Sequence, residues 1–272
     1  MMRQFVQKGD EMKNIGLSRR LAAVSRFVLP GSIVCDIGTD HAYLPIHIIR
    51  TGKAAKVIAT EAAQGPFERA GKNVREAGLE GKIELRKGDG LSVIDEQDQI
   101  GCITVAGMGG TLIANILEAG KDRLNGVKRL VVQPNVGARK VREWFLQNGW
   151  ELIGEEILEE DGQFYEILAA EKGDPYRPYR HLQKELLFGP FLLREKSPAF
   201  REKWRREKGD WEAVSDRLRF VKETASVREK KRELAQYIRW YEEEFPDETS
   251  DGSRCCPPDG ELRPEELRDG RG

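Results

Sequence analysis

Short apolar runs alternate with amphipathic stretches through the first 173 residues of the chain. The apolar runs predict five strands, and the amphipathic stretches predict helices between them. The predicted strands are Ser32–Ile37, Lys56–Thr60, Lys82–Arg86, Cys102–Ala106 and Leu130–Val132. The predicted helices are Tyr43–Arg50, Pro66–Ala77, Thr111–Leu124 and Ala138–Gln147. Strands that alternate with helices favour an α/β fold, a mainly parallel sheet with helices on both faces.

Two further strands are predicted close together at the end of this region. Glu151–Leu158 and Phe164–Ala170 flank a turn at residues 160–162. Because so short a connection joins only antiparallel strands, we expect a terminal antiparallel hairpin. Ahead of the first strand, apolar residues recur on one helical face and predict an N-terminal helix. These residues are Leu17, Leu21, Val24 and Val28.

Residues 174–245 follow a helical pattern, and we expect no strand there. Apolar residues repeat at spacings of three and four in two sets that are out of phase, so a turn or stutter is expected near Thr224–Val227. The sets are Trp211, Val214, Leu218, Val221 and Ala225, then Leu234, Ile238, Tyr241 and Phe245. The pattern predicts an α-helical coiled-coil domain built as a helical hairpin.

The chain as a whole is nearly neutral, with 45 Lys and Arg against 46 Asp and Glu. Its net charge nevertheless differs between three segments. Residues 174–245 carry a net charge of +4, and residues 246–272 a net charge of −4. We therefore predict an α/β domain at 1–173, a helical domain at 174–245, and an acidic, disordered tail at 246–272.

The composition argues against several classes of protein. No apolar run approaches the roughly 18 residues of a membrane span, and the first ten residues lack a signal-peptide pattern. Four cysteines form neither a metal-binding spacing nor a disulfide framework, so no metal site is predicted. We expect a cytoplasmic protein in which Cys35 and Cys102 are buried free thiols.

Candidate chemistry gathers at the predicted carboxyl ends of the strands, where parallel sheets bind ligands. Asp36 and Gly38 end the first strand, and a glycine there lets a ligand approach the backbone. The string is not a G-x-G-x-x-G pattern, and Asp40 and Ala42 occupy places where further glycines would be expected. A carboxylate repels a pyrophosphate, so Asp40 argues for a cofactor with a positive centre. The alternative is a plain turn in which Asp40 caps the helix.

The next two strand ends also carry acids. Glu61 can accept hydrogen bonds from both hydroxyls of a ribose. Asp89, followed by Gly90, can accept one from an adenine amino group. Each has an ordinary alternative, a surface glutamate and a common Asp-Gly turn. Acids and glycines at successive strand ends together predict a site for an adenosine cofactor.

Two more strings close the following strands. In Ala106-Gly107-Met108-Gly109-Gly110, three glycines in four residues permit close approach by a ligand or base, or else tight helix packing. The amides of Gln133-Pro134-Asn135 can read a base edge, or the string is only a turn. His41 can contact a phosphate or cap a helix. The sequence contains no Ser/His/Asp order and no phosphate-binding loop.

These strings resemble those of class I S-adenosylmethionine-dependent methyltransferases, which have a Rossmann-like fold. More closely, the chain resembles the bacterial tRNA adenine-22 N1-methyltransferases over about residues 12–245. The strings are residues 17–21 (LSRRL), 36–45 (DIGTDHAYLP), 65–67 (GPF), 88–91 (GDGL), 106–110 (AGMGG), 133–135 (QPN) and 159–162 (EEDG). Residues 188–196 (FGPFLLREK) resemble the linker into that family's coiled-coil domain.

The resemblance implies S-adenosylmethionine as cofactor and tRNA as partner. The cofactor residues it implies are Asp36, Gly38, His41, Glu61, Asp89, Gly90, Ala106, Gly107 and Met108. The candidate substrate residues are Gly109, Gly110, Gln133, Pro134 and Asn135. Arg205 and Arg206 are candidates for tRNA phosphates, although a solvated coiled coil or a dimer surface would have similar charges.

Asp40 is the candidate catalytic residue. Adenine N1 has an in-plane lone pair and can attack an activated methyl group directly, which leaves the ring cationic. A carboxylate that accepts a hydrogen bond from the N6 amino group would stabilise that charge. Two alternatives remain: a methyltransferase of small metabolites whose helical arm mediates oligomerisation, and a non-catalytic RNA-binding module.

Overall fold

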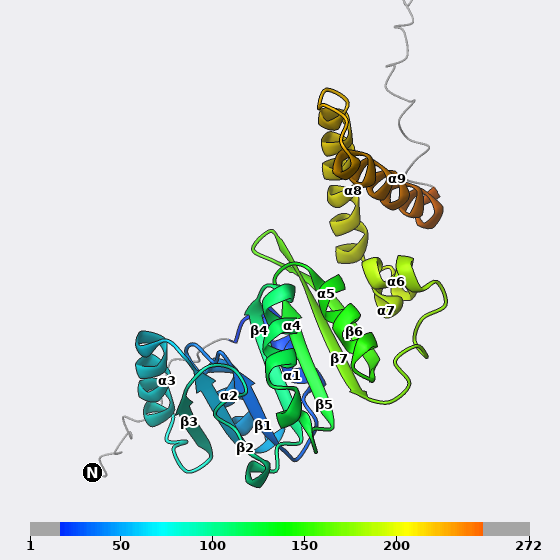
Figure 1. Cartoon of the computed structure of the whole chain (residues 1–272). Helices are drawn as coiled ribbons and strands as arrows, with labels where there is room; N and C mark the ends of the chain where they lie inside the picture. Colours follow the sequence, from blue (N-terminus) through cyan, green and yellow to red (C-terminus); the bar gives the residue numbers. More distant parts are fainter. Residues whose placement is uncertain (1–16, 247–272) are drawn as a thin grey trace, which may run out of the picture. The chain divides into compact units, whose positions relative to one another are not determined.

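The computed structural model describes residues 17–246 of the 272-residue chain, and the acidic tail beyond residue 246 lies outside this range. A seven-stranded sheet has the order β3-β2-β1-β4-β5-β7-β6 (Figure 1). Strands β1 to β5 pair in parallel, and β7 is antiparallel to both β5 and β6. The predicted mainly parallel sheet with a terminal antiparallel hairpin is confirmed.

Every predicted strand overlaps an observed one. The strands are β1 (Ser32–Ile37), β2 (Ala54–Glu61), β3 (Ile83–Lys87), β4 (Cys102–Met108), β5 (Arg129–Pro134), β6 (Trp150–Glu160) and β7 (Gln163–Lys172). The helices are α1 (Arg19–Phe27), α2 (Tyr43–Arg50), α3 (Gln64–Glu76), α4 (Gly110–Ala119), α5 (Ala138–Gln147), α6 (Leu182–Phe188), α7 (Pro190–Glu195), α8 (Pro198–Leu218) and α9 (Ala225–Glu244). Two short 3₁₀ helices are η1 (Glu96–Asp98) and η2 (Lys121–Leu124).

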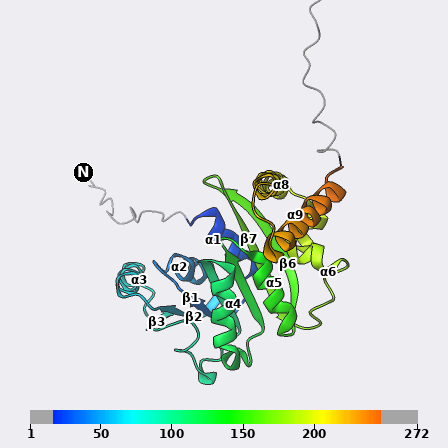
Figure 2. The ribbon, with the colours of Figure 1, turned by 45° about the horizontal axis from the view of Figure 1, so that its top comes forward.

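Helices cover both faces of the sheet (Figure 2). On one face, α1, α2 and α3 bury apolar side chains such as Val24, Ile48 and Val74. On the other face, α4 and α5 bury Leu117 and Phe145. Because both faces are covered, the ends of the strands are where a ligand can reach the backbone.

The predicted helix Thr111–Leu124 is wrong in its extent. Helix α4 ends at Ala119, and η2 follows after Gly120. A Cβ atom at Gly120 would lie 2.4 Å from the Leu91 side chain, so close packing requires glycine there.

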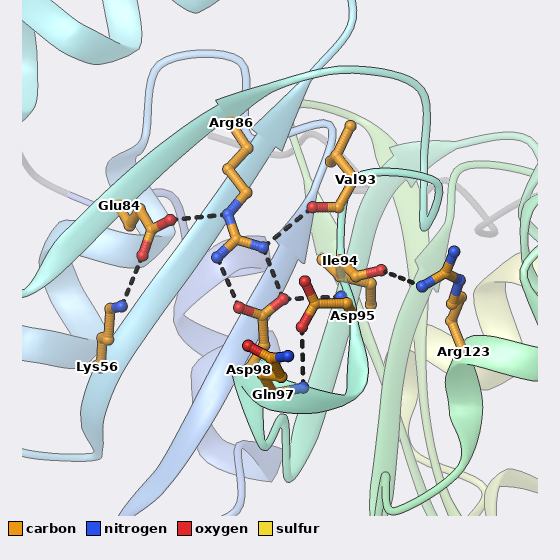
Figure 3. Close-up of polar contacts among 9 residues, drawn as sticks. All are labelled: Lys56, Glu84, Arg86, Val93, Ile94, Asp95, Gln97, Asp98 and Arg123. Carbon is orange, nitrogen blue, oxygen red and sulfur yellow. Dashed lines mark hydrogen bonds and ion pairs between the residues drawn. The ribbon is translucent and has the colours of Figure 1, made fainter.

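An ion-pair network fixes the loop after β3 (Figure 3). Arg86 donates two hydrogen bonds of 2.6 Å to Asp98 and one of 2.8 Å to Glu84. Glu84 also accepts from Lys56 of β2 at 2.6 Å. The hydrogen bonds from Arg86 lower the pKa of the Asp98 carboxyl. Because this loop contains Asp89, the network anchors a segment that carries a candidate site residue.

A second network of charges is buried between α5 and the hairpin of β6 and β7. Arg142 of α5 is fully buried and contacts Glu155 of β6 at 2.6 Å and Glu166 of β7. Lys203, near the start of α8, also donates to Glu166. The other carboxylate oxygen of Glu155 accepts from the Phe191 N–H at 3.0 Å. Two cations and two carboxylates therefore join α7 and the start of α8 to the sheet.

The chain divides into two compact units, residues up to Lys203 and residues from Trp204. The break falls within α8, later than the predicted domain boundary at residue 173, because α6 and α7 pack on α5 and β6. As predicted, residues 174–245 contain helices and no strand. None of the helices in the described range is long and apolar enough to cross a membrane.

Aromatic rings pack between the two helices of the second unit. Trp211 of α8 lies with its ring centroid 5.8 Å from that of Trp204 and 5.3 Å from that of Tyr237 of α9. Residues 219–224 connect the helices, slightly earlier than the break predicted from the spacing. The Thr224 hydroxyl caps α9 by accepting from the Val227 N–H at 3.2 Å, which ends the connection there.

Candidate active site

A cavity of about 540 Å³ opens at the carboxyl ends of β1 to β4. It lies where the sheet order reverses between β1 and β4, the usual ligand position in such sheets. Ten predicted site residues line it together: Asp36, Gly38, Asp40, His41, Glu61, Asp89, Gly90, Ala106, Gly107 and Met108. Segments far apart in the sequence thus converge on one cavity.

In the turn after β1, every second residue from Gly38 to Ala42 has a backbone in the left-handed region. Gly38, Asp40 and Ala42 have φ angles of +68°, +50° and +59°. Asp tolerates this left-handed region better than most residues, whereas Ala does not. The two places where the sequence lacks an expected glycine therefore keep the conformation that a glycine would adopt. Strained backbone of this kind is concentrated at functional sites.

Two acids of the cavity are held by hydrogen bonds. Asp36 is buried, and its Oδ1 accepts from the Thr104 hydroxyl of β4 at 2.6 Å. Burial raises the pKa of Asp36 to about 6, against the opposing effect of that hydrogen bond. The Glu61 carboxylate accepts from the main-chain N–H groups of Asp40 at 3.2 Å and Ala63 at 2.9 Å. The backbone thereby orients Glu61 at the cavity.

The carboxylate of Asp40 faces a histidine and an arginine side chain while remaining open to solvent. It is 60% exposed, and its oxygens lie 2.8 Å from Nδ1 of His41 and 3.9 Å from Arg69. The His41 ring stacks on Tyr43, with centroids 5.3 Å apart. Asp40 is therefore the accessible acid of the turn, in contrast to the buried Asp36.

Arg20 is a cavity residue for which the sequence analysis proposed no role. Among the described residues that line the cavity, it is the only Arg or Lys. Its guanidinium donates to Gln133 and lies 5.3 Å from the centroid of the Tyr165 ring. Glu160, in the hairpin between β6 and β7, accepts from the main-chain N–H of Arg20 at 3.4 Å. The signal was present, since residues 17–21 and 159–162 are both strings that carry the resemblance.

The string that ends β5 lies behind the cavity wall. Gln133 is fully buried; its Oε1 accepts from Arg20 and from the Gly107 N–H at 3.0 Å, and its Nε2 donates to Asn135 at 3.2 Å. Asn135 is exposed and donates to the Gly107 carbonyl at 2.8 Å. Pro134 is buried. The amides thus brace the Gly107 segment, and of the three residues only Asn135 reaches the surface.

The remaining substrate candidates have different surroundings. A Cβ atom at Gly110 would lie 2.1 Å from the Gly137 carbonyl oxygen, so the approach of α4 to the loop before α5 accounts for this glycine. A Cβ atom at Gly109 would meet no other atom within 4 Å. Arg205 and Arg206 belong to the second compact unit. Within residues 17–246, no group of three or more His, Cys, Asp or Glu side chains is arranged to hold a metal ion.

The lining of the cavity fits S-adenosylmethionine. The sulfonium and ammonium groups of that molecule suit the four acids Asp36, Asp40, Glu61 and Asp89, and its carboxylate suits the one arginine. A Cβ atom at Gly38 would lie 2.2 Å from the Met108 side chain, so the bare backbone there keeps the cavity open.

The fold and the cavity are those of a class I, S-adenosylmethionine-dependent methyltransferase. The model of the TrmK family, described as tRNA (adenine(22)-N(1))-methyltransferase, matches residues 34–243. The chain belongs to this family.

Relatives resemble the chain over most of its length. A Bacillus subtilis tRNA (adenine(22)-N(1))-methyltransferase is 42% identical over 234 residues, which cover 85% of this chain and 98% of the relative. The crystal structure of the B. subtilis m1A22 tRNA methyltransferase TrmK matches with a TM-score of 0.80, covering 84% of this chain and 98% of that one. Streptococcus pneumoniae Sp1610, solved in complex with S-adenosyl-L-methionine, is 40% identical with a TM-score of 0.75, over 84% of this chain and 99% of that one.

Proposed function

We propose that the chain transfers the methyl group of S-adenosylmethionine to N1 of adenine 22 in tRNA, and that the cavity at the strand ends holds the cofactor. The observation that carries this proposal is the convergence of ten predicted site residues on one cavity. Membership of the tRNA methyltransferase family favours tRNA over a small metabolite as the substrate.

Each polar group of the cofactor has a candidate partner in the cavity. Asp36, beside Gly38, receives the methionine ammonium, and Arg20 receives the carboxylate. Glu61, already oriented by two main-chain N–H groups, accepts from the ribose hydroxyls. Asp89 accepts from the adenine amino group. His41, Gly90, Ala106, Gly107 and Met108 complete the walls.

S-adenosylmethionine supplies a methyl group already activated by the sulfonium, so the protein mainly orients the nucleophile. Asp40 accepts a hydrogen bond from the N6 amino group of the target adenine and stabilises the positive charge that develops on the ring. Its carboxylate is accessible for this contact, being 60% exposed. Asn135, with Gly109 beside the cavity wall, contacts the base edge, while Gln133, Pro134 and Gly110 support this rim from behind.

The substitution Asp40→Asn tests the catalytic role. We expect turnover to fall at least about 100-fold, while the dissociation constant for the cofactor changes less than about threefold. Asp122→Asn, an acid outside the cavity, is the matched control and should leave both quantities unchanged. An equal loss of cofactor binding in Asp40→Asn would instead assign Asp40 to the cofactor.

The reaction itself is tested with the full chain, S-adenosylmethionine and unmodified tRNA. Mass spectrometry of nucleosides from the treated tRNA should find 1-methyladenosine, and position 22 should be mapped by digestion. Cofactor-induced thermal stabilisation without any methylated nucleoside would refute the proposal and favour a small-molecule substrate. No stabilisation at all would favour the non-catalytic alternative.

The helical part of the chain is proposed to serve tRNA binding. We assign catalysis to residues 1–173 and a coiled-coil tRNA contact to residues 174–245, with Arg205 and Arg206 near phosphates. The two helices with aromatic rings packed between them support the coiled coil. A substrate such as tRNA is also consistent with a cytoplasmic protein.

A further inference from the structure

The connection between α8 and α9 exposes an aromatic ring. We define the hairpin tip as residues 217–224. It comprises the end of α8 and the connection to α9, where the N–H groups of Arg219, Phe220 and Val221 donate to carbonyls three residues earlier, at 3.1 to 3.4 Å. The Phe220 side chain is 91% exposed, and that of Val221 is 48% exposed. Other aromatic residues of the two helices, such as Trp211 and Tyr241, are buried.

Cationic residues flank Phe220 on both sides in the sequence. Arg217, Arg219, Lys222 and Arg228 are exposed, and all lie within eight positions of Phe220 in the sequence. Arg219 pairs with Asp216 at 3.3 Å, and Arg217 donates to a carbonyl of its own helix. Glu223 and Glu229 are the other acids here, so the tip with the first turn of α9 carries more positive than negative charge.

This combination fits one kind of ligand best. An aromatic face stacks on any unpaired base, while Arg and Lys follow the adjacent phosphates. Paired RNA offers its bases no free face, so recognition of this kind is directed at loops and bulges. A protein partner would bury Phe220 equally well, but it would not require cationic residues both before and after Phe220 in the sequence.

We propose that the hairpin tip binds an unpaired segment of tRNA, with Phe220 stacked on a base and Arg217, Lys222 and Arg228 near the phosphates. This inference rests on the proposed function, because it names where the same substrate is held. It assigns to the tip a contact of base-stacking character, separate from the phosphate contacts proposed for Arg205 and Arg206.

The test measures tRNA binding and steady-state methylation for the full chain carrying Phe220→Ala, Phe220→Trp or Tyr176→Ala. Phe220→Ala should raise Kd and KM for tRNA at least about fivefold and leave kcat and the KM for S-adenosylmethionine unchanged. Phe220→Trp, which keeps an aromatic ring, should bind tRNA as tightly as wild type. Tyr176 is a 59% exposed aromatic outside the tip, so Tyr176→Ala should have no effect. Circular dichroism should be the same for all variants, since the substituted residues are exposed.

Salt dependence separates the ring from the charges. Phe220→Ala should weaken tRNA binding without changing the slope of log K against log salt. Arg217→Gln should make that slope shallower by the amount expected for the loss of about one phosphate contact. Equal Kd values for Phe220→Ala and wild type overturn the inference. The inference is also overturned if Phe220→Ala keeps its tRNA affinity but loses a concentration-dependent self-association that wild type shows in sedimentation. That result would mean that a second copy of the chain covers the Phe220 ring.

The inference and the proposed function fail in different ways. If wild type methylates tRNA and Phe220→Ala binds it normally, the tip proposal alone is wrong. If wild type binds tRNA through Phe220 but yields no methylated nucleoside, the proposed function is wrong and the tip proposal stands.

Discussion

Replacement of Arg142 by Met should destabilise the protein more than any surface change. The guanidinium is fully buried, and it contacts Glu155, Glu166 and the carbonyls of Leu186 and Leu187. Without it, Glu166 keeps Lys203, but Glu155 keeps only the Phe191 N–H. One buried carboxylate is then left without a cation, which costs about 3–5 kcal/mol.

That free-energy loss corresponds to a lower Tm by about 6–20 °C, at 2–4 °C per kcal/mol for a unit of this size. Thermal unfolding followed by circular dichroism measures it. Arg139→Met on the same helix is the control, because Arg139 is partly exposed, and we expect a loss of less than about 1 kcal/mol. The double change Arg142→Met with Glu155→Gln should recover part of the loss.

The pH dependence gives a second, independent check. Burial already raises the pKa of Glu155, and removal of Arg142 raises it further. A group whose pKa is higher in the folded state stabilises the fold at low pH, and this stabilisation is lost as the pH rises through the folded-state pKa. The deficit of Arg142→Met should therefore be larger at pH 8 than at pH 5. A Tm within about 2 °C of wild type at pH 8, or a deficit independent of pH, would refute this reasoning.

Three further outcomes follow from the site. Burial raises the pKa of Asp36 to about 6, so ionisation of this carboxyl weakens the fold as the pH rises. In thermal melts, Asp36→Asn should therefore raise the free energy of unfolding by about 2–3 kcal/mol at pH 8 and by less at pH 5. Calorimetry should show that the same variant binds the cofactor more weakly. Gly110→Ala should lower Tm by several degrees because its Cβ atom meets a backbone carbonyl at 2.1 Å; equal melts for Gly110→Ala and the open-space control Gly109→Ala would contradict this. Gly38→Ala should weaken cofactor binding, and adding Met108→Ala should restore it only in part, because the positive φ remains; full recovery would show that crowding alone matters.

The sheet could be predicted from the sequence because its strands and helices differ in the period of their apolar positions. The central strands are buried on both faces and read as continuous apolar runs, while amphipathic stretches such as Ala138–Gln147 mark the helices. The extent of α4 could not be predicted, since its end depends on the contact of Gly120 with Leu91, which is distant in sequence.

The candidate cavity was predictable for a similar reason. Its acids and glycines follow strands directly, so strand prediction locates them at one edge. The part played by Arg20 could not be predicted from local pattern, because that residue reaches the cavity through contacts with Gln133 and Glu160, each more than 110 positions away. Only the family resemblance of residues 17–21 and 159–162 pointed to it. The burial of Gln133 likewise depends on tertiary contacts, so the sequence indicated an amide that could read a base edge, whereas in the structure this amide accepts from the Gly107 N–H.

The clasp between α1 and the last hairpin has a consequence for synthesis on the ribosome. Glu160 accepts hydrogen bonds from the main-chain N–H groups of both Arg19 and Arg20. When only the first five strands have emerged from the ribosome, the acids of the cavity are present. Glu160, whose hydrogen bonds position Arg20, has not yet emerged. The cavity is therefore completed only when the ribosome has delivered β6, which carries Glu160, and β7, which joins β6 to the rest of the sheet, long after the first residues that line the cavity have emerged.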